Sequence, residues 1–107
     1  MFFGVVVELM PSFRGGGTRD VVRYIQQRIV WPRRKGKMVL AQGRVFASFT
    51  VGTNGRVRDV KIVKRLHPLF DAEVLRVVRA LPAFKPGRQA GEPVAVSFTV
   101  PITFRLE

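Results

Sequence analysis

Few residues in this chain have the chemistry for catalysis or metal binding. The chain has one histidine, seven carboxylates and no cysteine, which excludes disulfides, thiolate ligands and a cysteine nucleophile. His67 precedes Pro68 with no base or metal ligand at a useful spacing, so we interpret it as a turn or helix-start residue. Asp71 and Glu73 are better explained as first-turn helix residues than as a general acid and base.

A glycine triplet is the other feature that suggests chemistry. Gly15, Gly16 and Gly17 precede a predicted helix and superficially resemble a phosphate-binding loop. Such a loop ends in a lysine that binds the phosphates, and that lysine is missing here. From this inventory we expect no enzymatic activity, no cofactor and no metal site.

The positive charge of the chain is its strongest bulk property. Nineteen Lys and Arg residues outweigh seven Asp and Glu, for a formal net charge of +12. Such a surface attracts nucleic acid, anionic lipid or acidic protein. A nucleic-acid site usually concentrates its cations on one face, whereas here most are scattered singly. The densest cluster, in a predicted basic loop over residues 33–42, is Arg33, Arg34, Lys35 and Lys37.

Two helices are predicted from the spacing of apolar residues. The first covers about Thr18 to Val30, is capped by Thr18 and ends before Pro32, because a residue before proline disfavours the helical conformation. The second covers about Leu69 to Leu81 and stops at Pro82. The apolar stripes are Val21, Ile25 and Ile29 in the first helix, and Phe70, Val74, Val77, Val78 and Leu81 in the second.

Two strands with alternating apolar residues are predicted between the helices. The first, Arg44 to Val51, is joined to the second, Arg56 to Lys64, by a tight turn at Asn54-Gly55. The apolar phase slips within the second strand. We therefore predict a β-bulge near Arg58-Asp59, which restores one apolar face.

The last predicted strand has the cleanest alternation in the chain. It follows a turn-rich loop over residues 84–93, and its thirteen positions run from Val94 to Leu106, or roughly 40 Å at about 3.3 Å per residue. It is longer than any partner strand predicted in the domain. Pro101 has no N–H to donate, which confines it to an edge strand or a bulge.

A long exposed edge has two interpretations. One is a docking site, where a guest strand adds to the sheet through main-chain hydrogen bonds. The other is that Pro101 protects the edge and the extra length packs on the N-terminal arm. The residue pattern alone favours neither.

Together these elements predict an α+β fold in a single domain over residues 1–107. The order helix, strand, strand, helix, strand predicts a three-stranded, mostly antiparallel sheet with both helices on one face. Residues 1–17 form the N-terminal arm and residues 18–107 the core. The apolar run Phe2 to Val7 is too short to span a bilayer, so a role outside the cytoplasm requires an export signal on a longer parent chain.

Several short motifs, in the order in which they occur along residues 10–106, resemble the C-terminal domain of the TonB family. Each motif is modest, but their order and spacing are specific, and the opening is similar to the Bacteroidetes branch. Trp31 stands where the family usually has tyrosine. The matching stretches are Met10-Pro11-Ser12-Phe13-Arg14-Gly15-Gly16, Trp31-Pro32, Gly43-Arg44-Val45, Phe49-Thr50-Val51, Asn54-Gly55-Arg56-Val57, residues 69–75, Phe84-Lys85-Pro86-Gly87 and Val100-Pro101-Ile102-Thr103-Phe104.

The resemblance implies the periplasmic module of an inner-membrane-anchored energy transducer. TonB proteins are energised by the ExbB–ExbD proton motor through an N-terminal membrane anchor, which would precede this chain. Their C-terminal domain captures the TonB box of outer-membrane receptors for siderophores, vitamins or glycans as a strand added to the last strand. Here that strand is Val94 to Phe104, with Trp31-Pro32 near the receptor plug. The implied partner-binding residues are Trp31, Pro32, Val94, Val96, Phe98, Val100, Pro101, Ile102 and Phe104.

Alternative functions fit parts of the pattern. A nucleic-acid-binding α+β module would explain the charge, but Phe46 is its main aromatic candidate, and we expect no nucleic-acid partner. A regulatory TonB-like domain of a membrane sensor peptidase would share the family. The basic loop is either solvated charge or a capture site for an acidic receptor segment or anionic cell-wall polymer. An open edge would also permit a homodimer.

Overall fold

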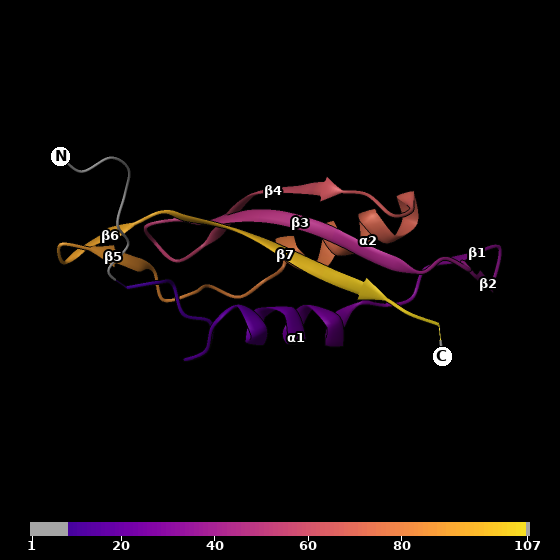
Figure 1. Ribbon diagram of the computed structural model, residues 1–107, viewed down its shortest axis with the longest axis horizontal. Helices are drawn as coiled ribbons and strands as arrows, with labels where there is room; N and C mark the ends of the chain where they lie inside the picture. Colours follow the sequence, from indigo (N-terminus) through magenta and orange to yellow (C-terminus); the bar gives the residue numbers. More distant parts are fainter. Residues whose placement is uncertain (1–8, 107) are drawn as a thin grey trace.

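The computed structural model describes residues 9–106, so the run Phe2 to Val7 and the first part of the N-terminal arm lie outside the described residues. Within these residues, two helices and seven strands follow one another (Figure 1). Their bounds are α1 Thr18–Arg28, β1 Arg33–Arg34, β2 Lys37–Met38, β3 Gly43–Val51, β4 Val57–Lys64, α2 Pro68–Arg79, β5 Gly87–Gln89, β6 Glu92–Val94 and β7 Val96–Phe104.

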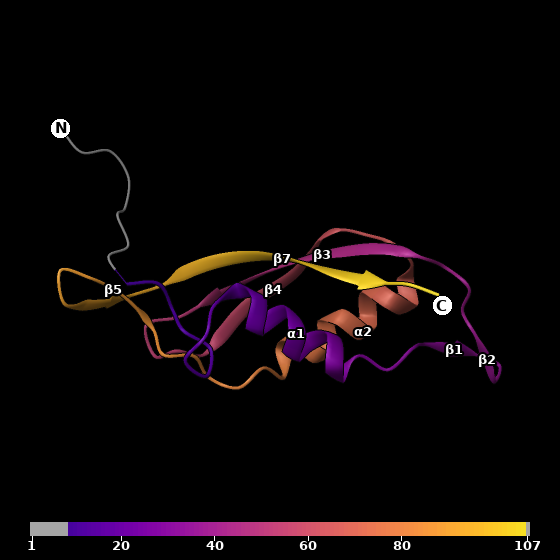
Figure 2. The ribbon, with the colours of Figure 1, turned by 60° about the horizontal axis from the view of Figure 1, so that its bottom comes forward.

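The centre of the fold is a three-stranded antiparallel sheet in the order β4-β3-β7. Both helices lie on one face of this sheet (Figure 2), with α2 packed on β4 and β3 and α1 packed beside β7. The predicted α+β class and the predicted arrangement of helices and sheet are confirmed. In the part of the chain that the structure describes, neither helix is long and apolar enough to cross a membrane.

The N-cap of helix α1 lies one residue earlier than expected. Gly17 is the N-cap residue, and the carboxylate of Asp20 accepts a hydrogen bond from its N–H at 3.1 Å. Thr18 is therefore the first helical residue, which corrects its predicted capping role. At the other end the helix stops at Arg28, because Ile29 has already left the helical conformation with ψ of 129°.

Helix α2 confirms the interpretation of His67 as a helix-start residue. His67 is the N-cap, and its ring Nδ1 accepts a hydrogen bond from the N–H of Leu69 at 3.1 Å. The Asp71 carboxylate accepts another from the N–H of Leu66 at 3.0 Å. These bonds satisfy backbone groups at the start of the helix, so both side chains have a structural role there.

The predicted β-bulge in the second strand is confirmed. Thr50 pairs with Arg58 while Ser48 pairs with Lys61, so two residues of β4 stand opposite one of β3. Asp59 lies in this bulge with a φ of 54°, a left-handed conformation that Asp tolerates better than most residues. A second irregularity, between Phe46 and the next residue, was not predicted.

Two segments predicted as loops contain hairpins, and one segment predicted as a single strand is divided in two. The segment predicted as a basic loop contains the β1–β2 hairpin, and the loop over residues 84–93 contains the β5–β6 hairpin. Both turns have two residues with positive φ, as type I′ turns require. The predicted strand from Val94 to Leu106 is interrupted at Ala95, so that β6 pairs with β5 and only β7 joins the central sheet. The turn residues are Lys35, Gly36, Ala90 and Gly91.

The core lies between the sheet and the helices and is rich in aromatic rings. Phe13, from the chain before α1, is buried against Tyr24 and Phe84 with ring centroids 5.1 and 5.0 Å away. At the far end of the core Phe70 stacks on Phe104 at 4.3 Å. The arm residues 9–12 pair with residues 85–88, so this part of the arm does not cover β7.

Candidate docking edge

Strand β7 forms one edge of the central sheet, as the position of Pro101 predicted. All nine of its residues pair with β3, from Val96 opposite Val51 to Phe104 opposite Gly43. The expectation that the last strand is longer than its partner is therefore wrong for the central sheet. What remains open is the other side of β7, along which no strand of residues 9–106 is paired.

Apolar side chains of β7 point toward the helices and the core. Val100, Ile102 and Phe104 are buried, and Val96 and Phe98 are partly buried. The predicted partner residue Val94 lies outside β7, in the β5–β6 hairpin. The apolar side chains of β7 anchor the strand within the domain. The open edge is therefore formed by main-chain groups.

Every second residue of β7 directs its main-chain N–H and C=O away from β3, toward the open edge. The N–H and C=O of Thr103 both bond to the side chain of Gln26, from α1, and so point away from β3. Because backbone direction alternates with a period of two along a strand, Ser97, Thr99 and Pro101 point the same way. Pro101 presents only its C=O to this edge, since proline has no N–H.

Gln26 covers the end of this edge. Its side-chain oxygen accepts a hydrogen bond from the Thr103 N–H at 2.7 Å, and its side-chain nitrogen donates one to the Thr103 C=O at 3.1 Å. An amide side chain thus makes the pair of bonds that a neighbouring strand would make. Sequence reasoning did not identify Gln26, because its role depends on a contact between residues 77 positions apart.

The opposite edge of the sheet, β4, is less suited to a guest strand. Its register is interrupted at two places along β3, and bulges twist an edge away from regular pairing. Exposed Lys61 and Lys64 add positive charge along it. The regular, nine-residue β7 is therefore the better template for an added strand.

Trp31 and Pro32 lie close to the end of β7. The Trp31 ring packs edge-on against Phe70 and Phe104, with centroids 5.1 and 5.8 Å away. Its indole N–H donates to the Val39 carbonyl at 2.8 Å. Trp31 and Pro32 are both half-buried, and their accessible parts line a hollow together with Leu69 and Arg76 of α2, while the indole holds the segment to the core.

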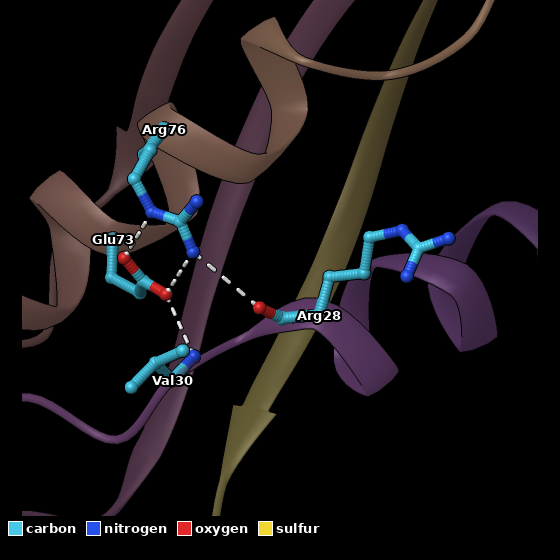
Figure 3. Close-up of polar contacts among 4 residues, drawn as sticks. All are labelled: Arg28, Val30, Glu73 and Arg76. Atoms are coloured by element: carbon cyan, nitrogen blue, oxygen red, sulfur yellow. Dashed lines mark hydrogen bonds and ion pairs between the residues drawn. The ribbon is translucent and has the colours of Figure 1, made fainter.

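A carboxylate on α2 fixes the chain just before Trp31 (Figure 3). Glu73 accepts two hydrogen bonds from the Arg76 guanidinium, both at 2.7 Å, and one from the Val30 N–H at 2.7 Å. Arg76 also donates to the carbonyl of Arg28, at 3.5 Å. The hydrogen bonds from Arg76 are the main reason that the pKa of Glu73 is lowered; partial burial opposes them and the Val30 bond adds to them. The ionised form of Glu73 therefore ties α2 to the end of α1.

Positive charge gathers on the β1–β2 hairpin, which projects from one end of the domain (Figure 1). Arg33, Arg34, Lys35 and Lys37 are all exposed there. The open face of the sheet carries Phe46, with the Lys64 ammonium 5.7 Å from the ring centroid. Within residues 9–106 no three His, Asp or Glu side chains gather as a metal site would require. The surface offers charge and main-chain edges as its means of recognition.

Known proteins share this arrangement. The model of the family described as Gram-negative bacterial TonB protein C-terminal matches residues 28–106. The solution structure of the Helicobacter pylori TonB C-terminal domain, residues 179–285, superimposes with a TM-score of 0.54 and 22% sequence identity over 88% of each chain. At that identity the likeness concerns the fold alone. No curated protein sequence matches the chain.

Proposed function

We propose that this chain, which belongs to the family of Gram-negative bacterial TonB protein C-terminal domains, binds the TonB box of an outer-membrane receptor as a strand added to β7. The observation that carries the proposal is the position of β7, a regular strand at the edge of the sheet with no strand of the described residues on its outer side. The guest would pair with the outward main-chain groups of Ser97, Thr99 and Pro101.

Strand addition suits a domain that recognises its partner mainly through main-chain groups. Main-chain hydrogen bonds supply affinity without requiring particular side chains, and neighbouring side chains supply selectivity. The hydroxyl of Ser97, on the edge strand, lies 2.9 Å from that of Thr50 on β3 and is one such neighbouring side chain. The buried apolar side chains of β7 transmit the load from the guest into the core.

In the complete transducer the domain would work in the periplasm as the receptor-binding end. A preceding segment would anchor the protein in the inner membrane and contact the ExbB–ExbD motor. Import of the receptor's substrate would then follow from force on the added strand. In this proposal the domain contributes binding and no catalysis, and His67 and Asp71 serve the start of α2.

A proline substitution tests the docking edge directly. Thr99→Pro removes one outward N–H without touching the groups that face β3, so the fold is expected to survive, as it does with Pro101 in the same strand. We expect a labelled peptide carrying the TonB box of a receptor from the same bacterium to bind at least tenfold more weakly. Fluorescence anisotropy measures the dissociation constant.

Thr99→Ala is the matched control, because it changes the same side chain and keeps the N–H. The control is expected to bind as the unmodified protein does. If Thr99→Pro is folded by circular dichroism and binds the peptide as tightly as Thr99→Ala, the guest does not pair with β7.

A further inference from the structure

The open edge of β7 is shorter than β7 itself, because Gln26 occupies its last outward residue. Both main-chain groups of Thr103 are bonded to the Gln26 amide. Pro101, two residues before, offers only a carbonyl. Among residues 9–106, the main-chain donors of the edge that have no partner are thus confined to its first half, at Ser97 and Thr99.

The position of Gln26 on α1 is set by the packing of that helix. Ile25, the residue before it, is fully buried, and Val21 one turn earlier is also buried. Helix α1 packs beside β7. Gln26 therefore lies where the helix borders the sheet, and it is half-buried there. The next residue, Gln27, is exposed and points away from this contact.

We propose that Gln26 is a specificity-determining stop. It ends an added strand at Pro101, so that guest residues beyond this point add no affinity for β7. A guest that continues past Pro101 has to break the two hydrogen bonds between Gln26 and Thr103 before it can make two of its own, so it gains no affinity. A guest of four or five residues facing Ser97 to Pro101 obtains all the pairing that the edge offers. The inference rests on the proposed docking at β7.

The stop also limits pairing of the edge with a second copy of the chain. An exposed strand edge is a template for another edge. With Thr103 bonded to Gln26 and Pro101 lacking a donor, only the first half of β7 can pair, and two such short halves make a poor interface.

Replacing Gln26 tests the proposal in the folded domain. Gln26→Ala frees the Thr103 N–H and C=O, so a TonB box peptide long enough to reach Thr103 is expected to bind about tenfold more tightly, the effect of two added hydrogen bonds. Gln27→Ala, the matched control on the same helix, is expected to leave affinity unchanged. Amide hydrogen exchange at Thr103 without peptide is expected to be slow in the unmodified protein and fast in Gln26→Ala.

The possible outcomes distinguish the proposal about Gln26 from the proposal that a guest strand docks at β7. Equal binding by Gln26→Ala and the unmodified protein would show that Gln26 does not limit the guest, while docking at β7 would stand. Binding to neither protein would overturn both. If Gln26→Ala fails to fold, the unmodified protein is tested with peptides of increasing length: affinity should stop rising once the guest reaches Pro101, and a continued rise would contradict the proposal.

Discussion

At the scale of single residues, Trp31 joins three parts of the molecule. Its ring lies against Phe70 of α2 and Phe104 of β7, and its indole N–H bonds to Val39. We predict that Trp31→Ala destabilises the domain by about 2–4 kcal/mol, because it leaves a cavity between aromatic rings. Urea unfolding followed by circular dichroism measures the loss.

Trp31→Phe serves as the control for packing. It keeps an aromatic ring and loses the hydrogen bond to the Val39 carbonyl, at a cost of about 1 kcal/mol. If Trp31→Ala unfolds at the same urea concentration as the unmodified protein, the ring does not hold the end of β7 in place.

Glu73 gives the stability of the domain a pH-dependent component. Its pKa is lowered in the folded state, so the stabilisation it provides is fully present above the unfolded pKa of about 4.3. That stabilisation is lost as the pH falls through the lowered, folded pKa. We predict that Glu73→Gln costs about 1–2 kcal/mol at pH 7 and progressively less at pH 4 and below.

Urea unfolding of both proteins at several pH values tests this difference. Glu92→Gln, which changes an exposed carboxylate on β6, is the control and is expected to cost little at any pH. A constant difference between Glu73→Gln and the unmodified protein from pH 7 to pH 3 would contradict the role given to the ionised carboxylate.

The residues of the candidate docking edge, the outer side of β7, were only partly predictable from sequence. The prediction that Pro101 lies in an edge strand is confirmed, and the same proline also indicates which residues face outward. Since its missing N–H belongs on the outer side, residues in step with it present their main chain outward, which indicates Ser97 and Thr99. The apolar residues of β7, which the family resemblance implies as partner-binding residues, have side chains that face the core. Gln26 was beyond prediction, because no local pattern records a contact between α1 and the end of β7.

At the scale of elements, the long periodic segments were predictable and the short hairpins were not. Apolar spacing of 3.6 and 2 residues located α1, α2, β3 and β4, and the phase slip located the bulge at Asp59. The β1–β2 and β5–β6 turns use Lys35-Gly36 and Ala90-Gly91, whose first residues are not the Asn or Asp that usually marks such a turn. Each hairpin has strands of only two or three residues, too short to show a period.

The β1–β2 hairpin is the element on which the role of the charge can be decided. If it captures an acidic receptor segment, Arg34→Glu with Lys37→Glu should slow association of an acidic peptide several-fold at low salt. The difference should vanish near 0.5 M salt, where screening is nearly complete over such distances. Stopped-flow fluorescence measures the association rate.

A control with the same change of net charge separates the hairpin from the whole surface. Arg56→Glu with Lys85→Glu replaces two exposed cations outside the hairpin. Equal slowing by the two double variants would mean that only net charge matters and that the hairpin carries solvated charge.

At the scale of the whole molecule, the fold followed from element order. Two amphipathic helices and three central strands can bury their apolar faces together only as layers, with the helices on one side of the sheet. The order β4-β3-β7 leaves two edges, and regularity distinguishes them: β4 is bulged, whereas β7 pairs residue by residue with β3. The break at Ala95 lay beyond prediction, because alternation continues across it in the sequence.

Amide hydrogen exchange with bound peptide is the most direct test of docking at β7. The isotope-labelled domain is saturated with the TonB box peptide, and exchange is followed for each backbone amide by NMR. We predict that the Ser97 and Thr99 amides exchange much more slowly in the complex, while the amides of β4 keep their rates. A saturated complex in which Ser97 and Thr99 exchange as fast as in the free domain would contradict strand addition at this edge.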